Sequence, residues 1–151
     1  MKSIVSNDIQ NLISTCFATD PALIETFHVS SGSLQSCVER TCKDLSLTHP
    51  SFKLYEIEDE GMTVGFFGKE HSNYLTTIFV HPTYRKKESI VKIWSLIQSN
   101  FDEDFYTAVY EKNKPAIRFF TRNGTQIDKF NTESGPSVAF KFLKGSNSQC
   151  H

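Results

Sequence analysis

The chain has 151 residues, of which 38% are apolar and 22% charged, and a formal net charge of −1. This length suits one domain with a substantial core, to which the 13 Phe residues contribute much volume. The near-neutral charge gives no electrostatic basis for broad binding to nucleic acid or a membrane surface. The first ten residues contain no apolar signal segment, and no apolar run approaches roughly 18 residues, so we expect a cytoplasmic protein without a membrane span.

The chain has four cysteines, Cys16, Cys37, Cys42 and Cys150. No two of them form a C-x-x-C pair, and no His lies at zinc-finger spacing from them. Cys16, Cys37 and Cys42 fall in helical patterns, which favours buried free thiols. We therefore expect no metal site and a reducing compartment.

The first third of the chain predicts helices. Ser6-Asn7-Asp8 offers a helix N-cap, and Asp20-Pro21 is typical of a second helix start. Apolar residues then recur at helical spacing over residues 34–45 and stop before His49-Pro50. A break at Ser30-Ser31-Gly32-Ser33 separates these helices, and the first third of the chain is thus expected to be helical.

From Phe52 the apolar period changes from helical to extended. Residues 52–58 and 62–68 predict two strands of a hairpin around the turn residues 58–61. Residues 74–80 are nearly all apolar or Thr, which favours a strand buried on both faces. These three strands form an antiparallel meander. Its acidic tip (Glu56, Glu58, Asp59 and Glu60) is interpreted as a solvated edge that would also attract an amine-bearing molecule.

A strand–helix–strand–helix unit follows the meander. The turn Arg85-Lys86-Lys87-Glu88 leads into a helix whose apolar stripe runs from Ile90 to Phe101, with Trp94 in its core-facing position. Residues 105–110 predict the next strand. Asn113 then caps a short helix that stops at Gly124.

Residues 126–130 and 138–143 predict the last two strands, and residues 145–151 predict a disordered tail. The step from residue 74 to residue 110 requires a right-handed parallel crossover in an otherwise antiparallel sheet. The sequence therefore predicts an α+β fold, in one domain over residues 1–144. A six- to seven-stranded splayed sheet with one parallel crossover would carry helices on both faces. Ligands tend to bind where such a sheet changes sense, here just after Val80.

Together these residues resemble the general N-acetyltransferase (GNAT) superfamily. The matching segments are Ile78–Arg85, the helix to Phe101, and the run Val109-x-x-x-Asn113-x-x-Ala116-x-x-Phe119-Phe120-x-x-x-Gly124. With the preceding meander, the likeness covers roughly residues 52 to 143. The resemblance implies an enzyme that transfers an acetyl group from acetyl coenzyme A to an amine, on a small molecule or a protein, by direct attack.

The resemblance also implies a set of cofactor contacts. The backbone near Phe79 and Val80 would pair with the pantetheine arm, and amides of the turn after Tyr84 would hold the pyrophosphate. Asn113 and the helix that follows it would flank the thioester. The expected cofactor-binding residues are Phe79, Val80, Arg85, Lys86, Lys87, Glu88, Ser89, Ile90, Asn113 and Phe120.

The chain departs from the family pattern at three places. The family turn has glycine or alanine where this chain has Glu88 and Ile90, so side chains stand where a phosphate would approach the backbone. Many relatives have a Tyr general acid at the position of Phe120, which has no hydroxyl. The carboxylate base that some relatives carry early on the strand of residues 74–80 is missing.

No general acid or base is therefore assigned from the sequence. Tyr106 and Tyr110 are candidate acids on the strand before Asn113, and Glu111 is a candidate proton acceptor. His81 precedes a proline and is interpreted as a turn residue rather than a base. Asn113 is interpreted equally as a helix cap and as a cofactor contact.

Two alternatives to an active acetyltransferase stay open. Glu88, Ile90 and Phe120 also fit an inactive GNAT-like binding or structural module that has lost the cofactor site. Cys150 in the polar tail fits a regulatory thiol protein. The acceptor and the oligomeric state cannot be derived from the sequence, although the strand of residues 138–143 is expected to be an edge available to a second copy.

Overall fold

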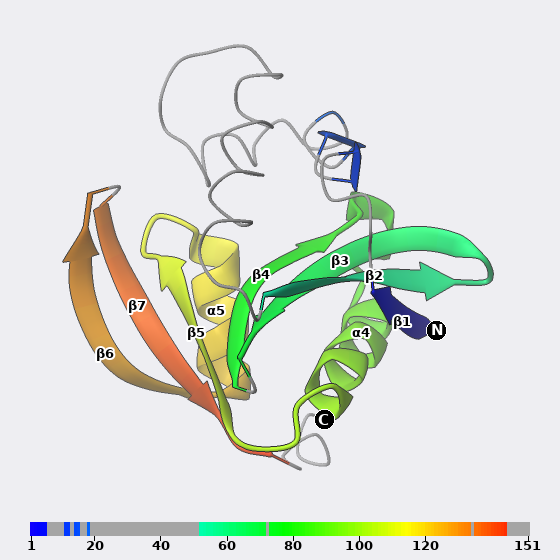
Figure 1. Cartoon of the computed structure of the whole chain (residues 1–151). Helices are drawn as coiled ribbons and strands as arrows, with labels where there is room; N and C mark the ends of the chain where they lie inside the picture. The colour runs from blue at the N-terminus through cyan, green and yellow to red at the C-terminus, as the bar shows by residue number, and fades with distance from the viewer. Residues whose placement is uncertain are drawn as a thin grey trace.

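The fold is built on a seven-stranded sheet in the order β1-β2-β3-β4-β5-β7-β6 (Figure 1). The computed structural model describes residues 1–5, 11–12, 14–15, 18, 52–71, 73–133 and 135–144. The strands are β1 (Lys2–Val5), β2 (Lys53–Asp59), β3 (Met62–Glu70), β4 (Tyr74–Val80), β5 (Phe105–Tyr110), β6 (Thr125–Thr132) and β7 (Gly135–Phe142). A short 3-10 turn η1 (Pro82–Tyr84) and the helices α4 (Lys87–Ser99) and α5 (Lys114–Asn123) complete the described elements.

The sheet is antiparallel except between β4 and β5, which run parallel. The predicted mixed sheet with one parallel crossover is therefore confirmed. The β2–β3 hairpin turns at Glu60 and Gly61, whose φ angles of 51° and 80° are both positive. This left-handed pair matches the right-handed twist of the flanking strands.

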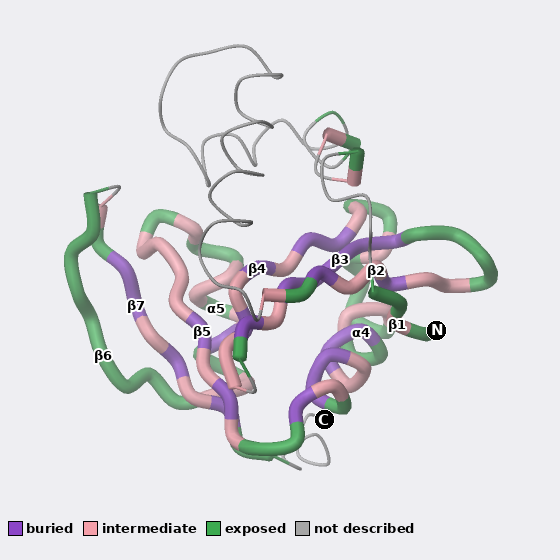
Figure 2. The backbone as a smooth tube through the Cα atoms, viewed as in Figure 1, coloured by how far each residue is buried: buried purple, intermediate pink, exposed green. Residues whose placement is uncertain are grey.

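Helices α4 and α5 pack on one face of the sheet through a cluster of aromatic rings. Trp94 of α4 is 3% exposed. Its ring centroid lies 5.0 to 6.1 Å from the rings of Phe105, Phe119, Phe120 and Phe142. The prediction that Trp94 belongs to the core is confirmed. Figure 2 shows buried residues along the inner turns of α4 and the middle strands.

The bounds of β4 and β5 agree with the predicted residues 74–80 and 105–110. Helix α4 begins at Lys87 rather than after Glu88, because Ile90 N–H already donates to the carbonyl of Lys86 at 2.9 Å. The other strands differ from prediction by one to three residues at their ends, where the apolar alternation fades.

The sheet differs from the prediction in two ways. Residues 2–5 form β1, a strand on β2, where no strand was predicted. The strand of residues 138–143 is not an edge, since β7 lies between β5 and β6. Its alternate side chains Val138, Phe140 and Phe142 are buried. Every residue of β6 is exposed, and β6 is the edge on that side (Figure 2).

Residues 11–12, 14–15 and 18 are helical, in agreement with the predicted first helix. The other helices predicted for the N-terminal third, and with them the predicted helices on the second face of the sheet, lie outside the described residues. The same holds for Cys16, Cys37, Cys42 and the tail with Cys150. Among the described residues, no helix is both long and apolar enough to cross a membrane.

Candidate functional site

The two parallel strands meet at one position and then part. Tyr74 of β4 pairs with Tyr106 of β5, and no other paired position joins these two fully described strands. Tyr106 N–H donates to the carbonyl of Asn73 at 2.8 Å, immediately before this pair. Beyond it, β4 and β5 run away from each other in a V (Figure 1). The β4 backbone after Tyr74 therefore has a β3 neighbour on one side and no strand partner on the other.

A β-bulge in β4 stands where the strands part. Gly68 pairs with Thr77 and Lys69 pairs with Leu75, so that Thr76 is an extra residue without a partner position. A bulge increases local twist and turns the following side chains to the other face. Accordingly Leu75 and Val80 both reach the core under α4. The hydroxyl of Thr76 is buried without a hydrogen-bond partner.

Side-chain hydroxyls complete the hydrogen bonds at the point of the V. Thr107 Oγ1 donates to the carbonyl of Leu75 at 2.7 Å. The phenol oxygen of Tyr74 has a hydrogen bond with the backbone of Ala108. Burial raises the pKa of Tyr74 above its ordinary value of 10.0, the nearby Glu70 carboxylate adds to the rise, and the Ala108 hydrogen bond opposes it. Tyr74 is therefore a neutral phenol at physiological pH.

The N-terminus of α4 follows the open end of β4 after the short η1 turn. Lys86 is the N-cap residue and makes no side-chain capping hydrogen bond. The amides of the first helical turn, which includes Glu88 and Ser89, have no partner inside the helix, and the helix dipole adds partial positive charge there. By contrast, α5 is capped by its own Asn113, whose Oδ1 accepts from Ala116 N–H at 3.4 Å.

The side chains around this turn point in different directions. Arg85 Nε donates to the Val80 carbonyl at 2.7 Å, and its guanidinium carbon lies 5.6 Å from the centroid of the Phe79 ring. Lys86, Lys87 and Glu88 are exposed. Ile90 packs against the core. At the two positions where the GNAT pattern has small residues, the side chain of Glu88 thus faces solvent and that of Ile90 faces the interior.

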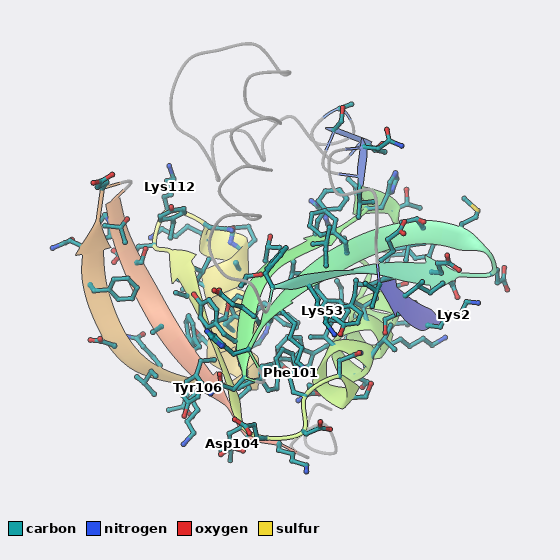
Figure 3. The ribbon with its side chains drawn as sticks, in the orientation of Figure 1. Lys2, Lys53, Phe101, Asp104, Tyr106 and Lys112 are labelled. Atoms are coloured by element: carbon teal, nitrogen blue, oxygen red, sulfur yellow. The ribbon has the colours of Figure 1, made fainter. Side chains whose placement is uncertain are left out.

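Asn113 and Phe120 have structural roles in α5. Asn113 is the N-cap of the helix. Phe120 is 6% exposed and packs on the rings of Trp94, Phe140 and Phe142. The first-turn end of α5 lies near the end of β5, where Figure 3 labels Lys112, and Tyr106 is labelled at the start of that strand.

The remaining candidates for proton transfer have local partners. His81 Nδ1 accepts from Thr83 N–H at 3.2 Å, as expected for a turn residue. Glu111 forms an ion pair with Lys129, with 3.6 Å between oxygen and nitrogen. Tyr110 lies under Lys112, whose Nζ is 5.7 Å from the ring centroid.

Sequence reasoning did not single out Tyr74. The residue was assigned only as the start of a buried strand, and no local pattern shows that β4 and β5 pair at a single position. The signal that could have identified it is its place as the first residue of a parallel strand, where a side chain reaches the neighbouring strand.

No protein-family model matches the chain, and no curated protein matches it at a significant level. Solved structures do match. A protein from Bacillus halodurans superposes with a TM-score of 0.71 at 11% identity, over 97% of this chain and 86% of that one. The aminoglycoside acetyltransferase AAC(6')-Ib bound to coenzyme A gives a TM-score of 0.68 at 11% identity, over 99% and 98% of the two chains.

A third match is the spermidine N-acetyltransferase from Vibrio cholerae in complex with coenzyme A and spermine. Its TM-score is 0.64 at 11% identity, over 97% of this chain and 98% of that one. The chain therefore has the fold of these acetyltransferases, and the predicted GNAT-like architecture is confirmed.

Proposed function

We propose that the chain is an N-acetyltransferase that moves an acetyl group from acetyl coenzyme A to an amine. The observation that carries the proposal is the single pairing of β4 with β5 at Tyr74 and Tyr106, which leaves one edge of β4 open beside the uncapped start of α4. An open strand edge can bind an extended chain through backbone hydrogen bonds. An uncapped helix N-terminus can bind phosphate. Acetyl coenzyme A has both an extended pantetheine arm with amide groups and a pyrophosphate.

The proposed cofactor contacts follow from this geometry. First-turn amides of α4, at Glu88 and Ser89, face the pyrophosphate, and Lys86 and Lys87 add positive charge beside it. The amide of Ile90 is already used by the helix, in its hydrogen bond to the Lys86 carbonyl.

The pantetheine amides pair with the backbone of Val80 on the open side of β4. The backbone of Phe79 faces β3 instead, since His81 N–H, two residues further on, donates to the Val64 carbonyl of β3. The Val80 carbonyl already accepts from Arg85, so its second lone pair serves the pantetheine, or Arg85 moves to the phosphates.

On the α5 side, Asn113 borders the pantetheine arm near the open end of the V, because it follows the end of β5. The buried ring of Phe120 supports this wall from the core. Direct attack by the amine on the thioester carbonyl needs no Cys or Ser nucleophile, because positioning and oriented amides lower the barrier by themselves. The proposed reaction is therefore a single displacement without an acetylated protein intermediate.

The acceptor in this proposal is an amine on a small molecule or on a protein. Matching structures include enzymes named for aminoglycosides, for spermidine and for the N-terminal serine of a ribosomal protein. We place the activity in one domain spanning residues 1–144 and in the cytoplasm, as the composition suggests. A contact between two copies would use an edge strand, β1 or β6, rather than β7.

Titration calorimetry with acetyl coenzyme A tests the proposal directly. We expect binding that is weakened by the double substitution Lys86→Ala and Lys87→Ala. The matched control Lys2→Ala removes an exposed lysine at the far edge of the sheet, in β1, and should bind as the unmodified chain does. Neither heat nor a thermal shift at millimolar cofactor would contradict the proposal.

Transfer itself is measured as coenzyme A thiol released with a panel of amines, including spermidine, kanamycin and a peptide that starts with serine. Tight binding of acetyl coenzyme A with no release of thiol, either to an amine or by slow hydrolysis, would instead favour the inactive module. This second candidate is supported by the departures from the GNAT sequence pattern at Glu88, Ile90 and Phe120.

A further inference from the structure

Side-chain hydroxyls of Tyr74 and Thr107 lie where β4 and β5 begin to part. Thr107 of β5 donates its hydroxyl proton to the Leu75 carbonyl. The phenol of Tyr74 is held instead by the backbone of Ala108, two residues beyond its strand partner Tyr106. A phenol oxygen that accepts from an amide N–H keeps its own proton for donation. Tyr74 thus presents an oriented donor where the strands begin to part.

The cofactor binding proposed above, on which this inference rests, brings the reacting atoms to the same point. With the pyrophosphate at α4, the pantetheine arm runs back along β4 from Val80 toward Tyr74. The stretch from Val80 to Thr76 spans about 13 Å of extended chain. The Tyr74–Tyr106 pair closes the V at its end. The sulfur is the end of the arm farthest from the phosphates, so it lies next to the closed end.

We propose that Tyr74 is the catalytic acid of this site and protonates the coenzyme A sulfur. The acceptor nitrogen forms a bond to the acetyl carbon, and the carbon–sulfur bond breaks with its electron pair on sulfur. The sulfur takes the phenol proton and leaves as a thiol. The nitrogen loses one proton on becoming an amide, and this proton restores the phenol. The sum is amine plus thioester giving amide plus thiol.

The surroundings of Tyr74 suit this role. Glu70, which pairs with Tyr74 across the β3–β4 hairpin, is 7% exposed, and its carboxylate is a route by which the proton from nitrogen returns to the phenol. Burial and the Glu70 charge raise the pKa of Tyr74, so the phenol holds its proton until a thiolate develops beside it. Phe120, the family position for this task, has no proton to give.

Substitution of one oxygen atom tests the assignment. For Tyr74→Phe we expect kcat for thiol release to fall about 100-fold, a typical size for loss of a general acid, with the KM for acetyl coenzyme A nearly unchanged. Tyr55→Phe is the matched control, since Tyr55 also lies on a strand but stacks on Phe67 in the core. Tyr55→Phe should leave kcat unchanged, and thermal unfolding shows whether both variants are folded. A Tyr74→Phe protein that turns over like the unmodified chain overturns the assignment.

A second measurement does not depend on knowing the acceptor. In protein labelled with ¹³C at the tyrosine ζ carbon, the resonance that disappears in Tyr74→Phe belongs to Tyr74. Saturation with coenzyme A should shift this resonance and leave that of Tyr55 in place. Binding without such a shift refutes the role of Tyr74 while the proposed cofactor site stands. Absence of binding refutes the proposed function, and the role of Tyr74 with it.

Discussion

Glu88 stands in the first turn of α4, where its charge has two opposite effects. Its carboxylate complements the helix dipole and so stabilises the start of the helix. The same carboxylate repels a pyrophosphate bound to the neighbouring amides. Because Glu88 is exposed, solvent weakens both effects, and the repulsion is expected to cost about 1 kcal/mol of binding free energy.

Glu88→Gln should therefore raise the affinity for acetyl coenzyme A about fivefold, since the charge is lost and the side chain keeps its shape. The free energy of unfolding should fall by about 0.5 kcal/mol through loss of the dipole interaction. Calorimetry and urea unfolding measure the two quantities. Glu60→Gln, in the β2–β3 turn, is the control and should change neither. Unchanged affinity in Glu88→Gln would mean that no phosphate lies beside this turn.

Individual side-chain directions were the part of the site that the sequence could not predict. The pattern placed Arg85, Glu88 and Ile90 at the turn. It could not show that Arg85 folds back to the Val80 carbonyl or that Ile90 joins the core, because both depend on which residues lie opposite in space. The position of Tyr74 beside the backbone of Ala108 was missed for the same reason.

At the scale of elements, α5 and its cap illustrate what local chemistry predicts well. Asn113 and Gly124 marked the beginning and the end of the helix, and the structure places the helix between these two residues. Caps and turn residues act within a few positions of one another, so the sequence contains the whole interaction. The bounds of β4 and β5 were predicted for a similar reason, as short apolar runs between turn signals.

Asn113→Ala separates the two interpretations of this residue. Loss of the cap should lower the free energy of unfolding by about 1 kcal/mol. If Asn113 is only a cap, acetyl coenzyme A binding to the folded protein should change little. Asn113→Ser keeps a capping oxygen and should restore most of the stability. A loss of affinity in both variants, out of proportion to the loss of stability, would show that the amide itself contacts the cofactor.

At the scale of the whole molecule, strand order was harder to predict than strand existence. β1 was missed because four residues, mostly exposed, have no apolar alternation to detect. β7 was placed at the edge because it comes last in the chain, whereas the sheet seats it between β5 and β6. Its buried Val138, Phe140 and Phe142 were the available sign of an inner strand.

The raised pKa of Tyr74 predicts how stability responds to alkali. Above pH 10.0 the unfolded chain releases the phenol proton more readily than the folded chain does. The folded state then binds more protons, and the free energy of unfolding falls as pH rises through this range. Tyr74→Phe should show a shallower fall between neutral pH and about pH 11, followed by the fluorescence of the single tryptophan, Trp94. Equal slopes in the two proteins would contradict this.

The single Tyr74–Tyr106 pair has a mechanical consequence. Strands β1–β4 form one part of the sheet and β5–β7 the other. The two parts are joined by one strand pair and by the packing of core rings such as Trp94. Amide hydrogen exchange should therefore resolve two opening free energies, one for each part, in the protein alone. A ligand that forms hydrogen bonds to both β4 and β5 would hold the two parts of the sheet together. The two opening free energies should then become more similar. Exchange that is already uniform without a ligand would show that the rings alone make the junction rigid.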